Sequence, residues 1–119
     1  MTASALVLRA EVLGDTVTLF ISGEIDASNV DELDNTLRLL LDAGPAVLYV
    51  DMSQVTFSES MAFQTLSNAA RHARDRGCRL VTVGLQAPAM RVVDILGLRT
   101  QLGIQPDRPA PPSPRPADS

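Results

Sequence analysis

The stretch LYVDMSQVTFSESMAFQTLSNAARHA, residues 48–73, decides how the rest of the chain is arranged. An apolar run over residues 47–50 stops at Asp51, and a short polar segment then leads to a helical pattern that begins near Glu59. A short continuous apolar run is typical of a strand that is buried on both faces of a sheet. The stretch therefore predicts a central strand, a polar loop and the start of a helix in direct succession.

The predicted loop carries three serines, Ser53, Ser58 and Ser60. The start of a helix presents backbone N–H groups that have no intrahelical partner, and the helix dipole adds partial positive charge there. A serine hydroxyl at that place either caps the helix or carries a phosphate whose charge the helix end stabilises. Which of these two roles the serine has decides what the loop does.

The composition indicates one small folded domain over residues 1–105 and a disordered tail over residues 106–119. The chain has 119 residues, of which 45% are apolar and 20% are charged, and this is enough for a hydrophobic core. Six prolines fall within residues 106–119, and a segment of that composition buries no core. The PPSP segment of the tail has two interpretations, a docking motif or simply part of a solvated tail.

Charge, aromatic content and cysteine usage exclude several kinds of partner. The net charge of −4 and an aromatic content of 3% argue against nucleic acid, because phosphate backbones attract basic proteins and bases stack on aromatic rings. The single cysteine, Cys78, forms no internal disulfide and fits a reducing compartment. No signal-peptide pattern is visible, and no apolar run approaches the roughly 18 residues of a membrane span. We therefore expect a cytoplasmic protein without membrane contact.

Hydrophobic periodicity and turn residues predict strands that alternate with helices. Strands are expected at residues 6–12, 16–22, 46–50, 79–83 and 99–104, a loop at residues 23–26, and helices at residues 30–43, 59–76 and 88–96. Ser28 or Asn29 is expected to cap the first helix, and Met90, Val93 and Leu96 are expected to face the core from the third. The pattern predicts an α/β fold, with a mixed sheet of about five strands and helices packed on one side.

Patterns typical of catalysis or metal binding are missing from the sequence. His72 is the only histidine, and a lone histidine between arginines on a helix is more often a surface or structural residue than a base. No Cys/His spacing suits zinc, and no glycine-rich loop resembles a nucleotide site. We therefore expect no enzyme activity, no catalytic residue, no bound metal and no cofactor.

Charge is unevenly distributed along the chain. Residues 1–60 contain ten acidic residues and two arginines, whereas residues 61–105 contain six arginines and two aspartates. A domain with an acidic side and an arginine-rich side suits a protein partner. Two solvated helix faces explain the same pattern equally well.

Two short motifs resemble the STAS-domain anti-sigma factor antagonists of bacteria. The segments GEID at residues 23–26 and DMSQVTFSES at residues 51–60 are similar to that family's loop after the second strand and to its segment between the third strand and the second helix. The stretch GLQAPAMRVVDILGL at residues 84–98 is similar to the region around the family's third helix. The resemblance covers residues 6–104 and implies a single STAS-like domain in the order β-β-α-β-α-β-α.

The resemblance also implies a mechanism of partner switching. In such proteins the partner is an anti-sigma factor that is also a serine kinase. The unphosphorylated antagonist binds this partner and releases the sigma factor, phosphorylation of one serine ends the binding, and a serine phosphatase restores it. By position that serine is Ser60 here, and the resemblance implies that its neighbours contact the partner: Asp26, Ser58, Glu59, Met61 and Gln64. A small domain with an apolar outer strand is also able to form a homodimer.

The chain departs from the family pattern around the candidate serine. Ser58 stands where the family prefers an apolar residue, Glu59 replaces Asp, Met61 replaces Ser or Thr, and Ala62 replaces Gly. Glutamate is a poorer helix cap than aspartate, so either Ser58 or a capping box of Thr56 and Glu59 is expected to cap the helix. Met61 and Ala62 are expected to add apolar bulk where a kinase would approach.

Two interpretations of Ser60 therefore stay open. As a regulatory phosphorylation site it makes the protein a switched antagonist. As a capping or structural serine it makes the protein a constitutive interaction or scaffold module of a signalling assembly. A third class, an accessory STAS module of lipid transport or small-ligand binding, has no lined pocket in the sequence to support it.

Overall fold

The computed structural model describes residues 5–105, which form a four-stranded sheet and three helices. In chain order the elements are β1 (Leu6–Leu13), β2 (Thr16–Ile25), α1 (Val30–Asp42), β3 (Val47–Ser58), α2 (Ser60–Asp75), β4 (Arg79–Val83) and α3 (Ala87–Leu96). The strand order is β1-β2-β3-β4, with β1 antiparallel to β2 and the other neighbours parallel. The predicted tail at residues 106–119 lies outside the described residues.

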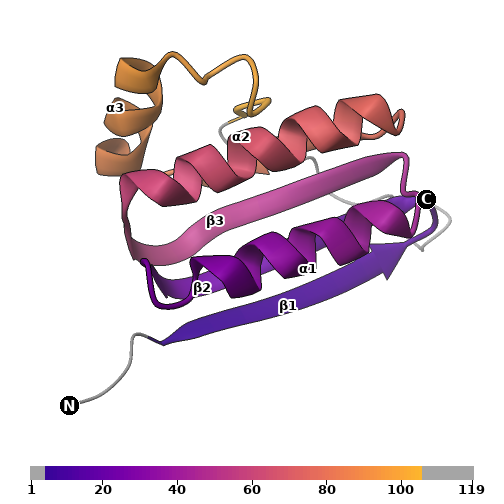
Figure 1. The fold of residues 1–119 in the computed structure, drawn as a ribbon, viewed down its shortest axis with the longest axis horizontal. Helices are drawn as coiled ribbons and strands as arrows, with labels where there is room; N and C mark the ends of the chain where they lie inside the picture. The colour runs from indigo at the N-terminus through magenta and orange to yellow at the C-terminus, as the bar shows by residue number, and fades with distance from the viewer. Residues whose placement is uncertain (1–4, 106–119) are drawn as a thin grey trace, which may run out of the picture.

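The helices α1 and α2 lie side by side across one face of the sheet, and α3 stands at the end of the molecule where α2 begins (Figure 1). Parallel neighbouring strands need a crossover connection, and α1 and α2 provide it for the pairs β2–β3 and β3–β4. The predicted α/β fold, with a mixed sheet and helices packed on one side, is confirmed.

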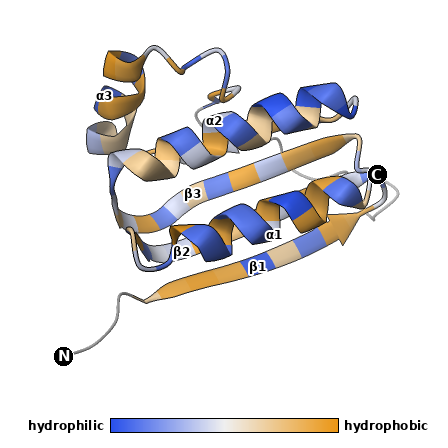
Figure 2. Cartoon of the chain, in the orientation of Figure 1, coloured by the Kyte–Doolittle hydropathy of each residue, from blue (hydrophilic) through white to orange (hydrophobic). Residues whose placement is uncertain are grey.

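The core lies between the sheet and the two long helices. Alternate side chains of the central strands face the helices, so Leu19 and Ile21 of β2 and Leu48 and Val50 of β3 are at most 1% exposed. The fully buried helix residues that meet them include Leu33, Leu37 and Leu41 of α1 and Ala62, Phe63, Leu66 and Ala73 of α2. Figure 2 shows hydrophilic residues along the outer sides of both helices. Four of the seven buried residues of α2 are alanines, which lets its backbone lie close to the strands.

The predicted strand at residues 99–104 is wrong, and the described sheet has four strands instead of about five. This segment forms successive turns, in which the N–H of Leu102 donates to the Leu98 carbonyl and the N–H of Ile104 to the Arg99 carbonyl. A single parallel bridge between Val83 and Gln105 remains beside β4. Leu102 is fully buried, so the apolar side chain that suggested a strand reaches the core from a turn instead.

The predicted polar loop after Asp51 is also wrong, because β3 continues to Ser58. The pairing of β2 with β3 is shifted twice along this part, as at a β-bulge. At the first shift, the Asp51 carboxylate accepts hydrogen bonds from the backbone N–H (2.9 Å) and hydroxyl (2.6 Å) of Ser53. Near the second, the Thr56 hydroxyl donates to the Gly23 carbonyl (3.2 Å). These polar side chains form hydrogen bonds to backbone groups where the strand pairing is irregular. The predicted loop at residues 23–26 is likewise wrong for residues 23–25, because β2 continues to Ile25.

The third helix contacts the core through few side chains, and Val93 is its one buried residue. Val93 is fully buried and Met90 half-buried, as expected, whereas Leu96 is 39% exposed and its predicted inward position is wrong. Since α3 stands at the end of the molecule (Figure 1), its last turn lies beyond the core. At its start, the Gln86 side-chain amide approaches the carbonyls of Ser53 and Val55 at 3.2 and 3.3 Å, which ties α3 to the irregular part of β3.

Candidate functional site

The two sequence motifs meet at one end of the molecule. The last residues of β2 and β3 lie beside the first turns of α1 and α2, on the left of Figure 1. Ile25 is the register partner of Ser58, and the N–H of Glu59 donates to the Ile25 carbonyl at 3.0 Å. Residues 23–26 and 51–60, which are far apart in the sequence, therefore lie side by side at this end of the molecule.

Ser60 is the first residue of α2, and its side chain is exposed. Among the described residues, its hydroxyl has no hydrogen-bond partner. Glu59 occupies the N-cap position in an extended conformation and makes no side-chain cap hydrogen bond, and the first turn of α2 contains no acidic residue. In contrast, Asp31 and Glu32 lie in the first turn of α1. The positive end of the α2 dipole is therefore free to stabilise an added anion.

Both predicted capping arrangements for α2 are wrong. Ser58 is the last residue of β3, and Thr56 uses its hydroxyl on the Gly23 carbonyl within the sheet. The predicted cap of α1 is half right: Asn29 occupies the N-cap position but makes no side-chain cap hydrogen bond. Its amide bridges the turn instead, accepting from the N–H of Asp26 (3.0 Å) and donating to the Glu24 carbonyl (2.9 Å).

The substitutions next to Ser60 differ in their effect on the surface. Ala62 is fully buried, so its methyl group fills the core and the prediction that it adds bulk in the path of a partner is wrong. Met61 is half-buried and Gln64 is exposed. Residues four apart on a helix lie on the same face, so Ser60 and Gln64 form one exposed stripe at the start of α2.

Asp26 lies half-buried in the turn between β2 and α1. Its carboxylate accepts hydrogen bonds from the backbone N–H (2.9 Å) and the hydroxyl (2.6 Å) of Ser28. These bonds stabilise the turn that precedes α1. Asp26 therefore helps to hold the backbone next to the Ser60 surface.

A pocket that was not predicted from the sequence lies beside this surface. It has a volume of about 190 Å³ and is enclosed by the irregular end of β3 and the start of α3. Its lining residues are Met52, Val55, Thr56, Phe57, Ser58, Leu85, Gln86, Pro88, Ala89 and Val92. Phe57 is 53% exposed at its edge. Of these residues only Ser58 was predicted to belong to the site, because the strand was expected to end before Asp51. Phe57, an aromatic residue next to a motif serine, was the available signal.

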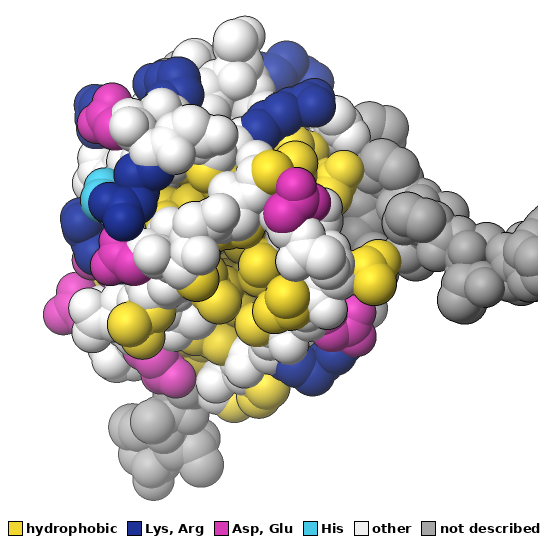
Figure 3. All heavy atoms as spheres, turned by 90° about the vertical axis from the view of Figure 1, so that its right-hand side faces the viewer, with side chains coloured by type: hydrophobic (Ala, Val, Ile, Leu, Met, Phe, Trp, Pro, Cys, Tyr) yellow, Lys and Arg dark blue, Asp and Glu magenta, His cyan; other side chains and the backbone are white. Residues whose placement is uncertain are grey.

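Acidic side chains gather at the Ser60 end of the molecule, whereas the opposite end carries charges of both signs. The Ser60 end carries the acidic residues of the β2 end, the first turn of α1 and the α2 N-cap: Glu24, Asp26, Asp31, Glu32 and Glu59. The opposite end faces the viewer in Figure 3, where both basic and acidic side chains lie around an apolar area. Exposed arginines at the end of α2 and the start of β4 contribute to it: Arg74, Arg76 and Arg79. A partner that meets the Ser60 end therefore approaches acidic side chains.

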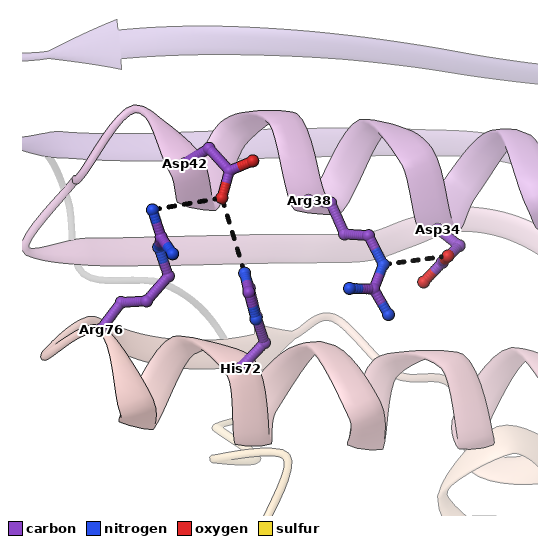
Figure 4. Close-up of polar contacts among 5 residues, drawn as sticks. All are labelled: Asp34, Arg38, Asp42, His72 and Arg76. Atoms are coloured by element: carbon purple, nitrogen blue, oxygen red, sulfur yellow. Dashed lines mark hydrogen bonds and ion pairs between the residues drawn. The ribbon is translucent and has the colours of Figure 1, made fainter.

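His72 faces α1 and lies far from the candidate serine. Twelve residues separate the two along α2, which corresponds to about 18 Å. Figure 4 shows His72 and Arg76 pointing toward Asp42 of α1, with N–O distances of 3.6 and 3.2 Å. The same view shows the ion pair within α1 between Arg38 and Asp34 (3.2 Å). His72 therefore belongs to the contact between the helices.

Within residues 5–105, no group of three or more His, Cys, Asp or Glu side chains is placed to hold a metal ion. In the same part of the chain, no helix combines the length and hydropathy needed to cross a membrane.

Cys78 is expected to be unreactive in the folded protein. Its side chain is buried, and burial raises the pKa of its thiol, an effect that a hydrogen bond with the Leu48 backbone partly opposes. Because the thiolate is the nucleophile, a buried thiol with a raised pKa reacts slowly. We predict that Ellman's reagent labels the native chain at least about tenfold more slowly than the urea-unfolded chain. Equal rates in the two states would contradict the buried position.

The chain is similar to a known domain family and to individual proteins. The family model described as "Mlab, STAS domain" matches residues 8–105. The anti-sigma-B factor antagonist of Listeria monocytogenes is 29% identical over 91 residues, which cover 76% of this chain and 80% of that protein.

Solved structures show the same fold. An anti-sigma factor antagonist from Mycobacterium paratuberculosis has a TM-score of 0.77 at 21% identity, covering 86% of each chain. The Bacillus cell fate determinant SpoIIAA in its phosphorylated form has a TM-score of 0.68 at 17% identity, covering 88% of this chain and 92% of that one. Because the family model matches residues 8–105, which are most of the chain, this chain belongs to the STAS domain family.

Proposed function

We propose that this protein is an anti-sigma factor antagonist that acts by binding in the cytoplasm and has no catalytic activity of its own. It binds an anti-sigma factor serine kinase, and this binding releases the sigma factor. Phosphorylation of Ser60 by the kinase ends the binding, and a serine phosphatase restores it. The observation that carries the proposal is the exposed, unbonded hydroxyl of Ser60 at the positive end of α2. The relation to the Listeria anti-sigma-B factor antagonist supports the choice of partner.

The proposed contact surface consists of the exposed stripe of α2 and the adjoining apolar edge. Ser60 and Gln64 provide polar contacts, Met61 and Phe57 provide apolar area, and Asp26, Ser58 and Glu59 complete the rim. The pocket between β3 and α3 is large enough to receive one apolar side chain of the partner. An apolar centre surrounded by polar residues is the usual composition of a protein interface. The acidic residues of this end favour a basic docking surface.

Phosphorylation of Ser60 is suited to break this contact without unfolding the domain. A phosphate adds about −1.5 to −2 charges, and at a helix start the dipole and free N–H groups stabilise it. In the complex, however, the same group is covered by the partner and lies next to Glu59, so its desolvation and the repulsion weaken binding. The folded state therefore tolerates the modification while the interface does not.

The direct test is phosphorylation by purified anti-sigma factor kinases of the source organism. With a cognate kinase and ATP, we expect the intact mass to increase by one phosphate group, and Ser60→Ala to abolish the increase. Thr100→Ala is the matched control, because it removes an exposed hydroxyl outside the proposed contact surface and should leave the modification unchanged. A phosphate that persists in Ser60→Ala would contradict the assignment of the site.

A second candidate is a STAS interaction module that is never phosphorylated. It is favoured by Met61, whose half-buried apolar side chain stands where the resemblance implies a second hydroxyl. In that case the kinase binds but leaves the mass unchanged. The apolar pocket also suits a small-ligand or lipid-transport accessory module, which native mass spectrometry of the purified chain would reveal as a bound apolar molecule.

A further inference from the structure

β1 is an unprotected edge of the sheet. Among the described residues it pairs with β2 on one side and has no strand on the other. Its register with β2 runs without interruption from Leu6 to Leu13, so no bulge bends it away, and it contains no proline. Val7, Val12 and Leu13 are 59%, 69% and 54% exposed, and Figure 2 shows β1 as a mostly hydrophobic strand. A long, regular, apolar edge is a template for pairing with another strand.

The hydrogen-bonding pattern between β1 and β2 determines which backbone N–H and C=O groups of β1 point to the open edge. The N–H of Glu24 donates to the Ala5 carbonyl at 2.9 Å, so Ala5 and Glu24 form a hydrogen-bonded pair of the antiparallel ladder. Such pairs alternate along the strand, so residues 7, 9, 11 and 13 direct their backbone groups toward β2. The N–H and C=O groups of residues 6, 8, 10 and 12 therefore point to the open edge.

The charged residues of β1 make the strand complementary to a second copy of itself. Arg9 and Glu11 lie two residues apart and form an ion pair at 2.7 Å on the sheet face away from the helices. In an antiparallel pairing of two β1 strands centred on Ala10, each Arg9 stands opposite a Glu11 of the other copy. Apolar residues also meet apolar residues, since Leu8 then faces Val12. Pairings centred on position 9 or 11 would place like charges opposite each other, which is unfavourable.

We propose that this protein forms a homodimer through antiparallel pairing of β1 with β1 of a second copy, centred on Ala10. The pairing continues the sheet across the two copies and uses the backbone groups that point to the open edge. Arg9 and Glu11 fall in positions without mutual backbone hydrogen bonds, where side chains of opposite strands come closest. The two Ser60 ends lie at opposite ends of the dimer, because the strands run antiparallel. The dimer therefore leaves both proposed partner surfaces accessible.

Cysteine cross-linking of the full chain tests both the dimer and its register. In the proposed pairing, the Cα atoms of Ala10 in the two copies are about 5.5 Å apart, within the range of a disulfide. Those of Val12 are about 14 Å apart, which is too far. We expect Ala10→Cys to form a covalent dimer under mild oxidation. Val12→Cys, which places an exposed thiol on the same strand and the same face, should stay uncross-linked, and buried Cys78 should not contribute.

Charge substitutions provide an independent test by sedimentation of the chain. The wild type should sediment at about twice its mass of 12.7 kDa, and Arg9→Glu or Glu11→Arg should raise the dimer dissociation constant at least about tenfold. Mixing these two variants should restore a dimer, because every acidic residue then faces an arginine. Arg38→Glu on α1, which also breaks an exposed ion pair, is the matched control and should leave the dimer intact.

The circular dichroism melting curve shows whether each variant is folded, since Arg9 also stacks on the Phe20 ring at 4.3 Å. A wild-type chain that is monomeric up to millimolar concentration would overturn the proposal. So would a cross-link in Val12→Cys with none in Ala10→Cys, or a mixture of the two folded charge variants that stays monomeric.

Discussion

Ser60→Asp is expected to weaken the binding of the anti-sigma factor kinase by about 2 kcal/mol or more, which corresponds to about 30-fold in the dissociation constant. The new carboxylate lies at the exposed start of α2, where the helix dipole stabilises it in the free protein. In the complex it is desolvated beside Glu59, so most of the cost appears on binding. Isothermal titration calorimetry with the cognate kinase measures the difference.

Two variants separate charge at this position from other effects. Ser60→Ala should bind as the wild type does but stay bound in the presence of ATP, because it has no hydroxyl to modify. Asn35→Asp adds the same charge at an exposed position of α1 and should change the affinity little. If Ser60→Asp binds as tightly as the wild type, Ser60 does not act as a charge switch.

Gly23→Ala is expected to destabilise the fold by about 3 kcal/mol or more, and to lower Tm by more than roughly 10 °C. Gly23 has a φ of +100°, which side chains rarely adopt, and an added Cβ would lie 2.1 Å from the Ala5 carbonyl oxygen. That oxygen accepts the hydrogen bond from the N–H of Glu24 that begins the β1–β2 ladder. The substitution therefore forces either strained backbone or separation of the two strands.

The matched control for this prediction is Gly14→Ala in the turn between β1 and β2. Gly14 also has a positive φ, +62°, but an added Cβ would have no atom within 4 Å. Gly14→Ala should therefore lower the free energy of unfolding only by the cost of the left-handed backbone conformation, about 1–2 kcal/mol. Thermal unfolding followed by circular dichroism compares the two variants. An equal loss in both would show that the contact with Ala5 has no effect on stability.

Helices and strands were predicted correctly from the sequence where the local hydrophobic pattern agrees with burial in the core. The helical spacing of Leu33, Leu37 and Leu41 predicted α1, and the alanine-rich pattern after Glu59 predicted α2. Each of these patterns places apolar residues on one side of a helix, and the pattern can be recognised from neighbouring residues alone. The first and fourth strands were likewise predicted from their local pattern, whereas β2 runs three residues beyond its predicted end.

The predictions failed where distant residues satisfy the backbone. Polar residues 51–58 read as a loop, but β2 supplies hydrogen-bond partners that hold them as an irregular strand. Residues 99–104 read as a strand, but Leu102 is buried in the core and its carbonyl accepts a hydrogen bond from the distant N–H of Thr82 (3.0 Å), which holds the segment as turns. The pocket beside Phe57 was missed for the same reason, since it needs both the longer β3 and the start of α3.

By itself, the sequence determined the α/β class, the order of the elements up to α3 and the position of Ser60 at a helix start, because hydrophobic periodicity depends on neighbours in the chain. Only the tertiary structure decided that the hydroxyl of Ser60 is exposed, that the methyl of Ala62 is buried, and that an apolar pocket adjoins them. It also decided that β1 is the open edge of the sheet. These properties depend on which strands and helices pack together, and that packing is set by contacts between residues far apart in the chain.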